Sequence, residues 1–240
     1  MPKSKYYAIY QELRDRIQDG TYAFQQLIPS EAHLTNEFQC SRNTVRRAIE
    51  LLSSEGLVQS VHGKGVVVIH EADKHSIFSL NRIESFTEAS ERNKLNCYTE
   101  ILLFSELTTD AHINRRTGFP IGCDIYYIQR LRYIDGVPLI VDHNYFLKDV
   151  AVGLTEELAQ GSIYAYLENT LGVVITTTKR VIRVEPITEH DEKHLQLDGC
   201  NCVAAVNNST FNSDGVMFEF TQSRHSPKYF EFHEISHRNG

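Results

Sequence analysis

The sequence lacks the features of several broad protein classes. It has no run of about eighteen apolar residues, so no transmembrane helix is expected. Its first residues, MPKSKYYAIYQEL, lack the apolar core of a signal peptide, and we expect a cytoplasmic protein. The five cysteines are an odd number, which is typical of reduced thiols rather than of a disulfide framework.

Common enzyme motifs are lacking as well. There is no G-x-S-x-G motif, no phosphate-binding P-loop and no Rossmann glycine pattern. His190 and His194 lie four residues apart in a predicted helix and could share a metal ion, but no third ligand is evident. We therefore expect no catalytic residues, no metal site and no cofactor.

Positive charge is scarce overall, but it is unevenly distributed. The net charge of the 240 residues is −7. Residues 1–69 carry eight Lys or Arg and seven Asp or Glu, so this part is near +1 and the remainder is near −8. A local basic face can still bind phosphates. The small excess predicts weak DNA binding by a single copy, so dimerisation should be needed.

The most informative residues are 41–69. Ser41 suits a helix N-cap and Gly56 suits the position after a helix end. An apolar stripe at helical spacing is formed by Val45, Ala48, Ile49 and Leu52. The polar and basic side chains that point elsewhere are Arg42, Asn43, Arg46 and Arg47. Such a helix suits entry into a DNA major groove.

Two apolar runs follow, residues 57–61 and 66–69, separated by His62-Gly63-Lys64-Gly65. This pattern predicts a hairpin with a cationic, glycine-rich tip. Upstream, residues 6–17 have helical spacing, and Ser30 can cap a second helix. Three helices and a hairpin form a winged helix-turn-helix within residues 1–69. The simpler alternative is an amphipathic surface helix with an incidental basic face and an ordinary hairpin.

These residues resemble the GntR family of bacterial transcription regulators. The motifs that carry the resemblance are Pro29-Ser30-Glu31, Ser41-Arg42-Asn43-Thr44-Val45-Arg46, Glu55-Gly56-Leu57-Val58 and His62-Gly63-Lys64-Gly65. The resemblance implies double-stranded operator DNA as partner, contacted from the recognition helix by Ser41, Arg42, Asn43, Thr44 and Arg46, and from the wing by His62 and Gly63. The basic Arg47 and Lys64 complete the predicted DNA-binding set. Ala32 stands where many members have arginine, so no contact is predicted there.

Residues 70–79 are polar and charged, and we interpret them as a linker to a second domain of residues 80–240. This domain should be an antiparallel α+β structure. Predicted helices cover residues 84–93 and 162–171 and a short segment from Thr188; predicted strands cover residues 97–106, 123–134, 139–146, 173–184, 202–211, 216–224 and 228–235.

The second domain resembles the UTRA ligand-binding domain of the HutC branch of the family, whose fold is similar to chorismate lyase. Three segments resemble the trehalose operon repressors: Ser162-Ile163-Tyr164-Ala165-Tyr166-Leu167-Glu168, Val184-Glu185-Pro186 and Thr221-Gln222-Ser223-Arg224-His225. The resemblance implies a homodimeric repressor whose inducer is a phosphorylated disaccharide, trehalose 6-phosphate. The alternatives are a regulator that answers to a different phosphosugar, or a lyase-like enzyme with a vestigial head.

An anion site is predicted where Ser85, Phe86 and Thr87 begin a helix, because unpaired amides and the helix dipole favour phosphate there. Arg130 and Arg132 lie two apart on a strand and share a face. A phosphate would relieve their mutual repulsion. The simpler alternatives are plain helix capping and a solvated strand face paired with carboxylates.

The resemblance adds further effector-binding positions: Asp142, Ser162, Tyr164, Glu219 and His225. Tyr164 could instead be part of the core. Strand parity provides a check on the grouping. A two-residue loop at Asp135-Gly136 would place Asp142 and Arg130 on opposite faces of the hairpin, so the effector site predicts a loop with an odd number of residues.

Overall fold

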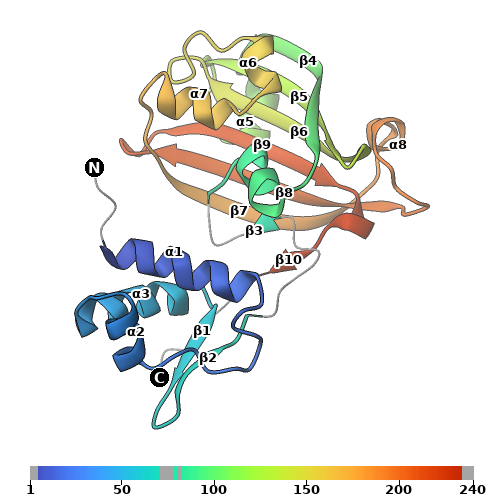
Figure 1. Cartoon of the computed structure of the whole chain (residues 1–240). Coiled ribbons are helices and arrows are strands. Elements are labelled where there is room, and N and C mark those ends of the chain that lie inside the picture. The colour runs from blue at the N-terminus through green and yellow to red at the C-terminus, as the bar shows by residue number, and fades with distance from the viewer. Residues whose placement is uncertain (1–4, 71–77, 80–82, 234–240) are drawn as a thin grey trace. The chain divides into compact units, whose positions relative to one another are not determined.

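The computed structural model of the chain describes residues 5–70, 78–79 and 83–233. Two compact units are present among the described residues, one containing residues 5–70 and 233 and the other residues 78–79 and 83–232 (Figure 1). The predicted α+β class is confirmed. Residues 71–77 of the predicted linker lie outside the described residues. The predicted domain limits, 1–69, 70–79 and 80–240, therefore stay predictions.

The first unit contains three helices and a hairpin, as predicted. They are α1 (Lys5–Gln18), α2 (Glu31–Glu37), α3 (Arg42–Ser54), β1 (Val58–Val61) and β2 (Gly65–Val68). The hydroxyls of Ser30 and Ser41 accept hydrogen bonds from first-turn amides of α2 and α3. Gly56 follows α3 at a φ of 68°, which favours glycine. The core between the helices and the hairpin includes the buried Leu13, Leu34, Leu52 and Val58.

The second unit is built around one long, curved sheet. Its elements are β3 (Phe78–Ser79), α4 (Phe86–Asn93), β4 (Cys97–Thr108), α5 (Ala111–Thr117), β5 (Asp124–Ile134), β6 (Val137–Leu147), α6 (Glu156–Gln160), α7 (Ile163–Asn169), β7 (Ile175–Pro186), α8 (Glu189–His194), β8 (Cys202–Asn212), β9 (Met217–His225), the 3-10 turn η1 (Pro227–Tyr229) and β10 (Phe232–His233). β3 pairs with β10.

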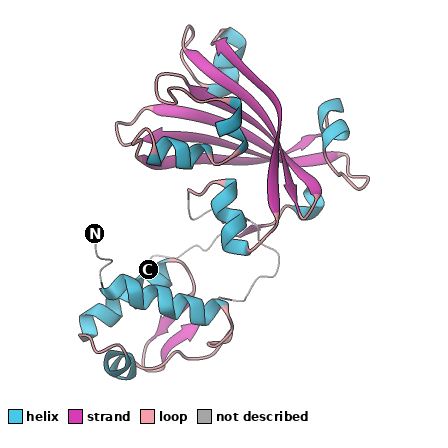
Figure 2. Ribbon diagram, turned by 45° about the horizontal axis from the view of Figure 1, so that its top comes forward, coloured by secondary structure: helices cyan, strands magenta, loops and turns pink. Residues whose placement is uncertain are grey.

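The sheet has the strand order β4-β5-β6-β9-β8-β7, and all neighbours are antiparallel. Helices lie on both of its faces (Figure 2). Leu167 of α7 packs with Phe146 on one face. On the other face, Ile113 of α5 packs with Ile125, and Leu195 at the end of α8 closes a second cluster. Core side chains therefore occupy both faces of the sheet.

The predicted strand over residues 228–235 is wrong in part. Residues 227–229 form η1, which begins at Pro227, a residue that has no amide hydrogen for a strand ladder. Only Phe232–His233 is a strand among the described residues, and residues 234 and 235 lie outside them. The short helices α5 and α6 were not predicted. Asp110 and Thr155 cap them and were the available signals.

The hairpin between β5 and β6 differs from the prediction in the number of residues in its loop. The loop has two residues, Asp135 and Gly136, both at positive φ as a type I′ turn requires. The prediction of an odd loop is therefore wrong. The register nevertheless shifts between Arg132 and Tyr133, where Leu139 is the extra residue of a bulge beside Pro138.

Candidate functional site

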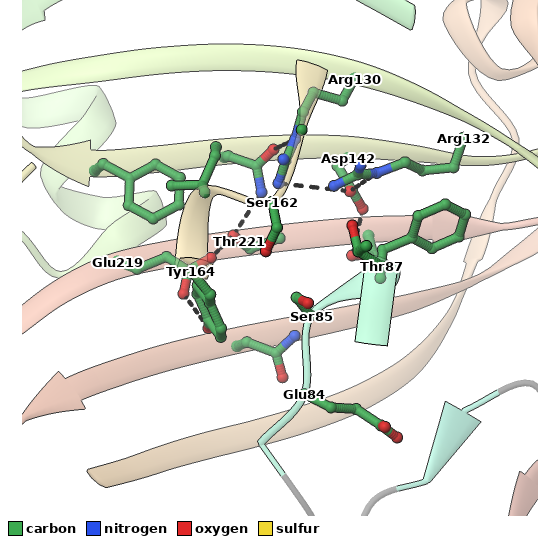
Figure 3. Close-up of a pocket in the computed structure, with 17 residues that line it drawn as sticks. Glu84, Ser85, Thr87, Arg130, Arg132, Asp142, Ser162, Tyr164, Glu219 and Thr221 are labelled. Carbon is green, nitrogen blue, oxygen red and sulfur yellow. Dashed lines mark hydrogen bonds and ion pairs between the residues drawn. The ribbon is translucent and has the colours of Figure 1, made fainter. Parts of the chain in front are cut away.

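A cavity opens on the sheet face that is bordered by α4 and α7 (Figure 3). With its open mouth included, the space is about 550 Å³. Nine of the ten predicted effector-binding residues line the cavity: Ser85, Phe86, Thr87, Arg130, Arg132, Asp142, Ser162, Tyr164 and Glu219.

The N-terminus of α4 forms one wall. The Ser85 hydroxyl accepts a hydrogen bond from the Glu88 amide at 3.2 Å, and the Glu88 carboxylate accepts one from the Ser85 amide at 2.7 Å. Phe86 and Thr87 follow in the first turn, where amides have no acceptor within the helix. This wall therefore places first-turn amides at the positive end of the helix dipole.

Two arginines of β5 stand in a second wall. The Arg132 Nε donates to Asp142 at 2.9 Å, and its guanidinium lies 4.8 Å from the centre of the Phe86 ring. The Arg130 Nε donates to Asn144 at 2.7 Å. Burial, together with the neighbouring Arg132, lowers the pKa of Arg130 to about 9. The wall therefore holds two closely spaced cations in a poorly solvated place.

Asp142 is the carboxylate that faces both arginines. It lies 2.9 Å from Arg132 and 4.0 Å from Arg130, and the Ser223 hydroxyl donates to it at 2.6 Å. Burial raises its pKa, but attraction to Arg132 and Arg130 outweighs burial and leaves the pKa below its usual value. Asp142 thus faces both guanidinium groups, and the carboxylate of Glu219 also acts electrostatically on Arg130.

The floor of the cavity is a continuous chain of hydrogen bonds (Figure 3). The Asn144 side chain donates to Thr221 at 2.8 Å, and Thr221 donates to Glu219 at 2.6 Å. The Tyr164 hydroxyl donates to the other oxygen of Glu219 at 2.5 Å. Burial raises the pKa of Glu219 and, together with Glu219, that of Tyr164. Such a floor offers fixed polar groups to the hydroxyls of a ligand.

The structure places the predicted effector-binding residues Ser162 and His225 differently with respect to the cavity. Ser162 caps α7, accepts a hydrogen bond from the Ala165 amide at 3.2 Å and lines the cavity. His225 is not among the lining residues, and its predicted place in the effector group stays a prediction. It is buried with its ring 4.9 Å from that of Phe230, and burial lowers its pKa to about 4. The position matched by resemblance therefore has a core environment here.

Sequence reasoning missed eight lining residues: Glu84, Asn144, Phe146, Gly161, Ile163, Asn208, Thr221 and Ser223. Some of them had a signal. Asn144 lies two residues after Asp142, and Thr221 lies two after Glu219, so the alternation of a strand places them on the same face. Asn208 had no such signal, because β8 carried no predicted site residue.

The predicted DNA-binding residues lie at the start of α3 and in the wing. Arg42, Asn43, Arg46 and Arg47 are exposed along the first turns of α3, and the wing tip exposes His62, Gly63 and Lys64. Ser41 caps α3 and hydrogen-bonds Thr44 at 2.8 Å. The Arg46 Nε donates to both carboxylate oxygens of Glu31 at 3.0 Å, whereas Arg47 lies over the Tyr6 ring at 4.3 Å.

In residues 5–70, 78–79 and 83–233, no helix has the length and apolar character needed to cross a membrane. Over the same ranges, no group of three or more His, Cys, Asp or Glu side chains is arranged to hold a metal ion.

Comparison with known proteins gives two family matches. The model for bacterial regulatory proteins of the gntR family matches residues 5–68, and the UTRA domain model matches residues 92–231. The chain is similar to the HTH-type transcriptional regulator TreR of Bacillus subtilis, with 31% identity over 99% of each chain. It is also similar to the regulator GmuR of the same organism, with 29% identity over 92% of this chain and 94% of GmuR.

Solved structures have the same architecture. The crystal structure of YydK from Bacillus subtilis matches with a TM-score of 0.83 at 22% identity, over 98% of this chain and 100% of that one. The effector-binding domain of the B. subtilis trehalose repressor TreR matches with a TM-score of 0.55 at 31% identity, over 60% of this chain and 99% of that one.

Proposed function

The chain belongs to the GntR family of bacterial transcription regulators and carries a UTRA domain, and from this premise we propose a repressor that a sugar phosphate releases from its operator. It is a regulator of the GntR/HutC type and not an enzyme. The first unit would bind double-stranded operator DNA in the cytoplasm. The cavity of the second unit would bind the effector.

One observation carries the effector proposal: the buried pair Arg130 and Arg132 opposite the α4 N-terminus. Asp142 pairs with both guanidinium groups. A phosphate monoester would add negative charge beside them and several acceptors for bidentate arginine hydrogen bonds. The amides of Phe86 and Thr87 would bind the same phosphate from the helix N-terminus.

The floor supports a sugar as the remainder of the effector. Glu219, Asn208 and Thr221 present acceptors and donors at fixed positions, which suits a ring bearing hydroxyls. Trehalose 6-phosphate is the first compound to test, because the relative TreR is a trehalose repressor. Another phosphosugar is the alternative, since phosphate binding explains the arginines without identifying the sugar.

For DNA binding we propose a homodimer. A head with a charge near +1 binds phosphates weakly alone, whereas two heads can occupy successive major grooves about 34–36 Å apart. The contacts would come from the start of α3 and from the wing. The proposed DNA-binding residues are Ser41, Arg42, Asn43, Thr44, Arg46, Arg47, His62, Gly63 and Lys64.

Release would follow from a change in the geometry of the dimer. To move a two-state equilibrium between its extremes, a ligand must prefer one state by about 5.5 kcal/mol. Two effector sites per dimer could share this preference. The effector must therefore bind the released form more tightly than the DNA-bound form.

A gel-shift titration on the promoter of the chain's own gene tests the proposal. We expect a shifted duplex at moderate salt and its loss on adding trehalose 6-phosphate. Absence of any shift would contradict the DNA-binding proposal. A bound duplex that no sugar phosphate releases would contradict only the effector assignment.

A further inference from the structure

The edge strand β7 carries an arginine on the same face as the cavity. Arg180 pairs in register with Asn208 of β8, which in turn lies opposite Thr221 of β9 and, one strand further, Asn144 of β6. Directly opposed residues in antiparallel strands project to the same face. Asn208, Thr221 and Asn144 all line the cavity. Arg180 therefore extends this polar row beyond the lining residues.

The contacts of Arg180 leave most of its donors unused. Its Nε donates to the Asn208 side-chain oxygen at 2.8 Å. Among the residues that the structure describes, its two Nη nitrogens have no hydrogen bond and no carboxylate partner. The residue is only partly exposed. Burial lowers its pKa, while Tyr164 and Glu84, both lining residues, oppose the change.

The position of β7 in the sheet determines how long a ligand must be to reach Arg180 from the arginine pair. Four strand intervals separate β5, which carries Arg130 and Arg132, from β7. At about 4.8 Å per interval the two backbones are roughly 19 Å apart along the sheet. A phosphate at the arginine pair would place the first sugar ring over β6 and β9. A second ring would then lie over β8 and reach toward β7.

We propose that Arg180, oriented by Asn208, binds hydroxyls of the second ring of a phosphorylated disaccharide and so determines specificity for disaccharide over monosaccharide phosphates. The inference rests on the proposed phosphosugar site. Arg180 contributes nothing to phosphate capture and acts only on ligands long enough to reach it. A half-buried guanidinium whose Nη atoms have no partner among the described residues is suited to this role, because a ligand oxygen can accept hydrogen bonds from them.

Strand β7 also provides a matched control. Arg183 lies three residues further along the same strand and is exposed. It pairs with Ala205, which is opposite Arg224, so it projects from the face away from the cavity. Arg180→Gln and Arg183→Gln remove the same charge from the same strand on opposite faces. A difference between them therefore reports position and not net charge.

Isothermal titration of the full chain with trehalose 6-phosphate, sucrose 6-phosphate and glucose 6-phosphate tests the proposal. We expect Arg180→Gln to weaken binding of at least one disaccharide phosphate about tenfold to hundredfold, as expected for lost hydrogen bonds to a charged group. Glucose 6-phosphate binding should be unchanged. Arg183→Gln should match the unmodified chain for all three ligands, and the thermal midpoints without ligand should agree.

Four results would overturn the inference. Equal behaviour of Arg180→Gln and Arg183→Gln would remove the specific role, and an equal loss for monosaccharide and disaccharide phosphates would reduce Arg180 to a general electrostatic contribution. Binding of glucose 6-phosphate alone by the unmodified chain would contradict the inference but leave a phosphosugar site. Failure of every sugar phosphate to bind would instead overturn the proposed effector function, and the inference with it.

Discussion

Arg130 lies directly opposite Asp142 across the antiparallel strands β5 and β6, and both side chains face the cavity. The bulge at Leu139 creates this register. Without the bulge, the two-residue turn would have turned Asp142 toward the opposite face of the sheet. Arg130 and Asp142 therefore face the same side of the sheet only because β6 has one extra residue between the turn and the site.

Replacing Arg130 by methionine should abolish induction without loss of operator binding. The arginine is buried beside Asp142 and donates to Asn144, and burial lowers its pKa. Removing one partner of a buried ion pair costs about 3–5 kcal/mol, but Asp142 keeps Arg132 as a partner, so the loss should be smaller here. We expect at most a modest fall of the thermal midpoint without effector, and no release of DNA by trehalose 6-phosphate in a gel shift. Arg183→Met is the surface control; inducible repression by Arg130→Met would contradict the proposed phosphate site.

Asp142→Asn should destabilise the second unit and make it dependent on anions. The change removes the carboxylate that pairs with both buried guanidinium groups, and breaking a buried pair in this way costs about 3–5 kcal/mol. Inorganic phosphate should then raise the thermal midpoint more for this variant than for the unmodified chain. Asp149→Asn, at an exposed position, controls for loss of a surface carboxylate. Equal responses to phosphate would argue against an anion site between the arginines.

Stability should fall as the pH drops from about 6.5 to about 4. Burial lowers the pKa of His143 and of His225 from 6.5 to about 4. In this window the unfolded chain binds protons that the folded chain does not, so acid favours unfolding. The loss approaches about 3 kcal/mol per histidine, at 1.36 kcal/mol per pKa unit.

Urea unfolding at pH 7, 5.5 and 4.5 measures this dependence. His143→Gln should reduce the pH dependence by about one histidine's share. His33→Gln, whose imidazole is 68% exposed in the first unit, should not change it. If the His143 variant kept the full pH dependence of its free energy of unfolding, groups other than His143 would be the cause.

Arg46→Ala should weaken operator binding by roughly tenfold to hundredfold, the range for one lost side-chain contact with a base. The arginine lies on the exposed side of α3, and Glu31 holds its Nε in place. Effector binding should be unchanged, because Arg46 belongs to the first unit. Arg14→Gln removes one charge from α1 as a control. Equal losses for both variants would indicate general charge attraction instead of a specific contact.

Much of the fold could be predicted from the sequence because its signals are local. Four of the predicted helices begin at a residue whose side chain caps the first turn. These residues are Ser30, Ser41, Ser85 and Thr188. Apolar stripes and alternation identified the buried faces. The short helices α5 and α6 escaped because one or two turns give little periodicity, and Pro227 diverted the predicted last strand into a turn.

The cavity was predictable only in part, because it depends on contacts between distant segments. Alternation placed Arg130 and Arg132 on one face, and resemblance added Asp142. The bulge at Leu139 carries no distinct sequence signal beyond the neighbouring Pro138. Asn208 and Arg180 join the site through the strand order, in which β9 lies between β6 and β8. Such an order is a property of the whole sheet.

The capping box of α4 has a consequence for how a signal could begin. Glu88 already occupies the Ser85 amide with its own carboxylate, so the helix is nucleated before any ligand arrives. The binding free energy of an effector would therefore not be reduced by the cost of a coil-to-helix transition. We expect α4 to move as a rigid body when the effector binds. Its first turn lies a few residues after the predicted linker in the sequence.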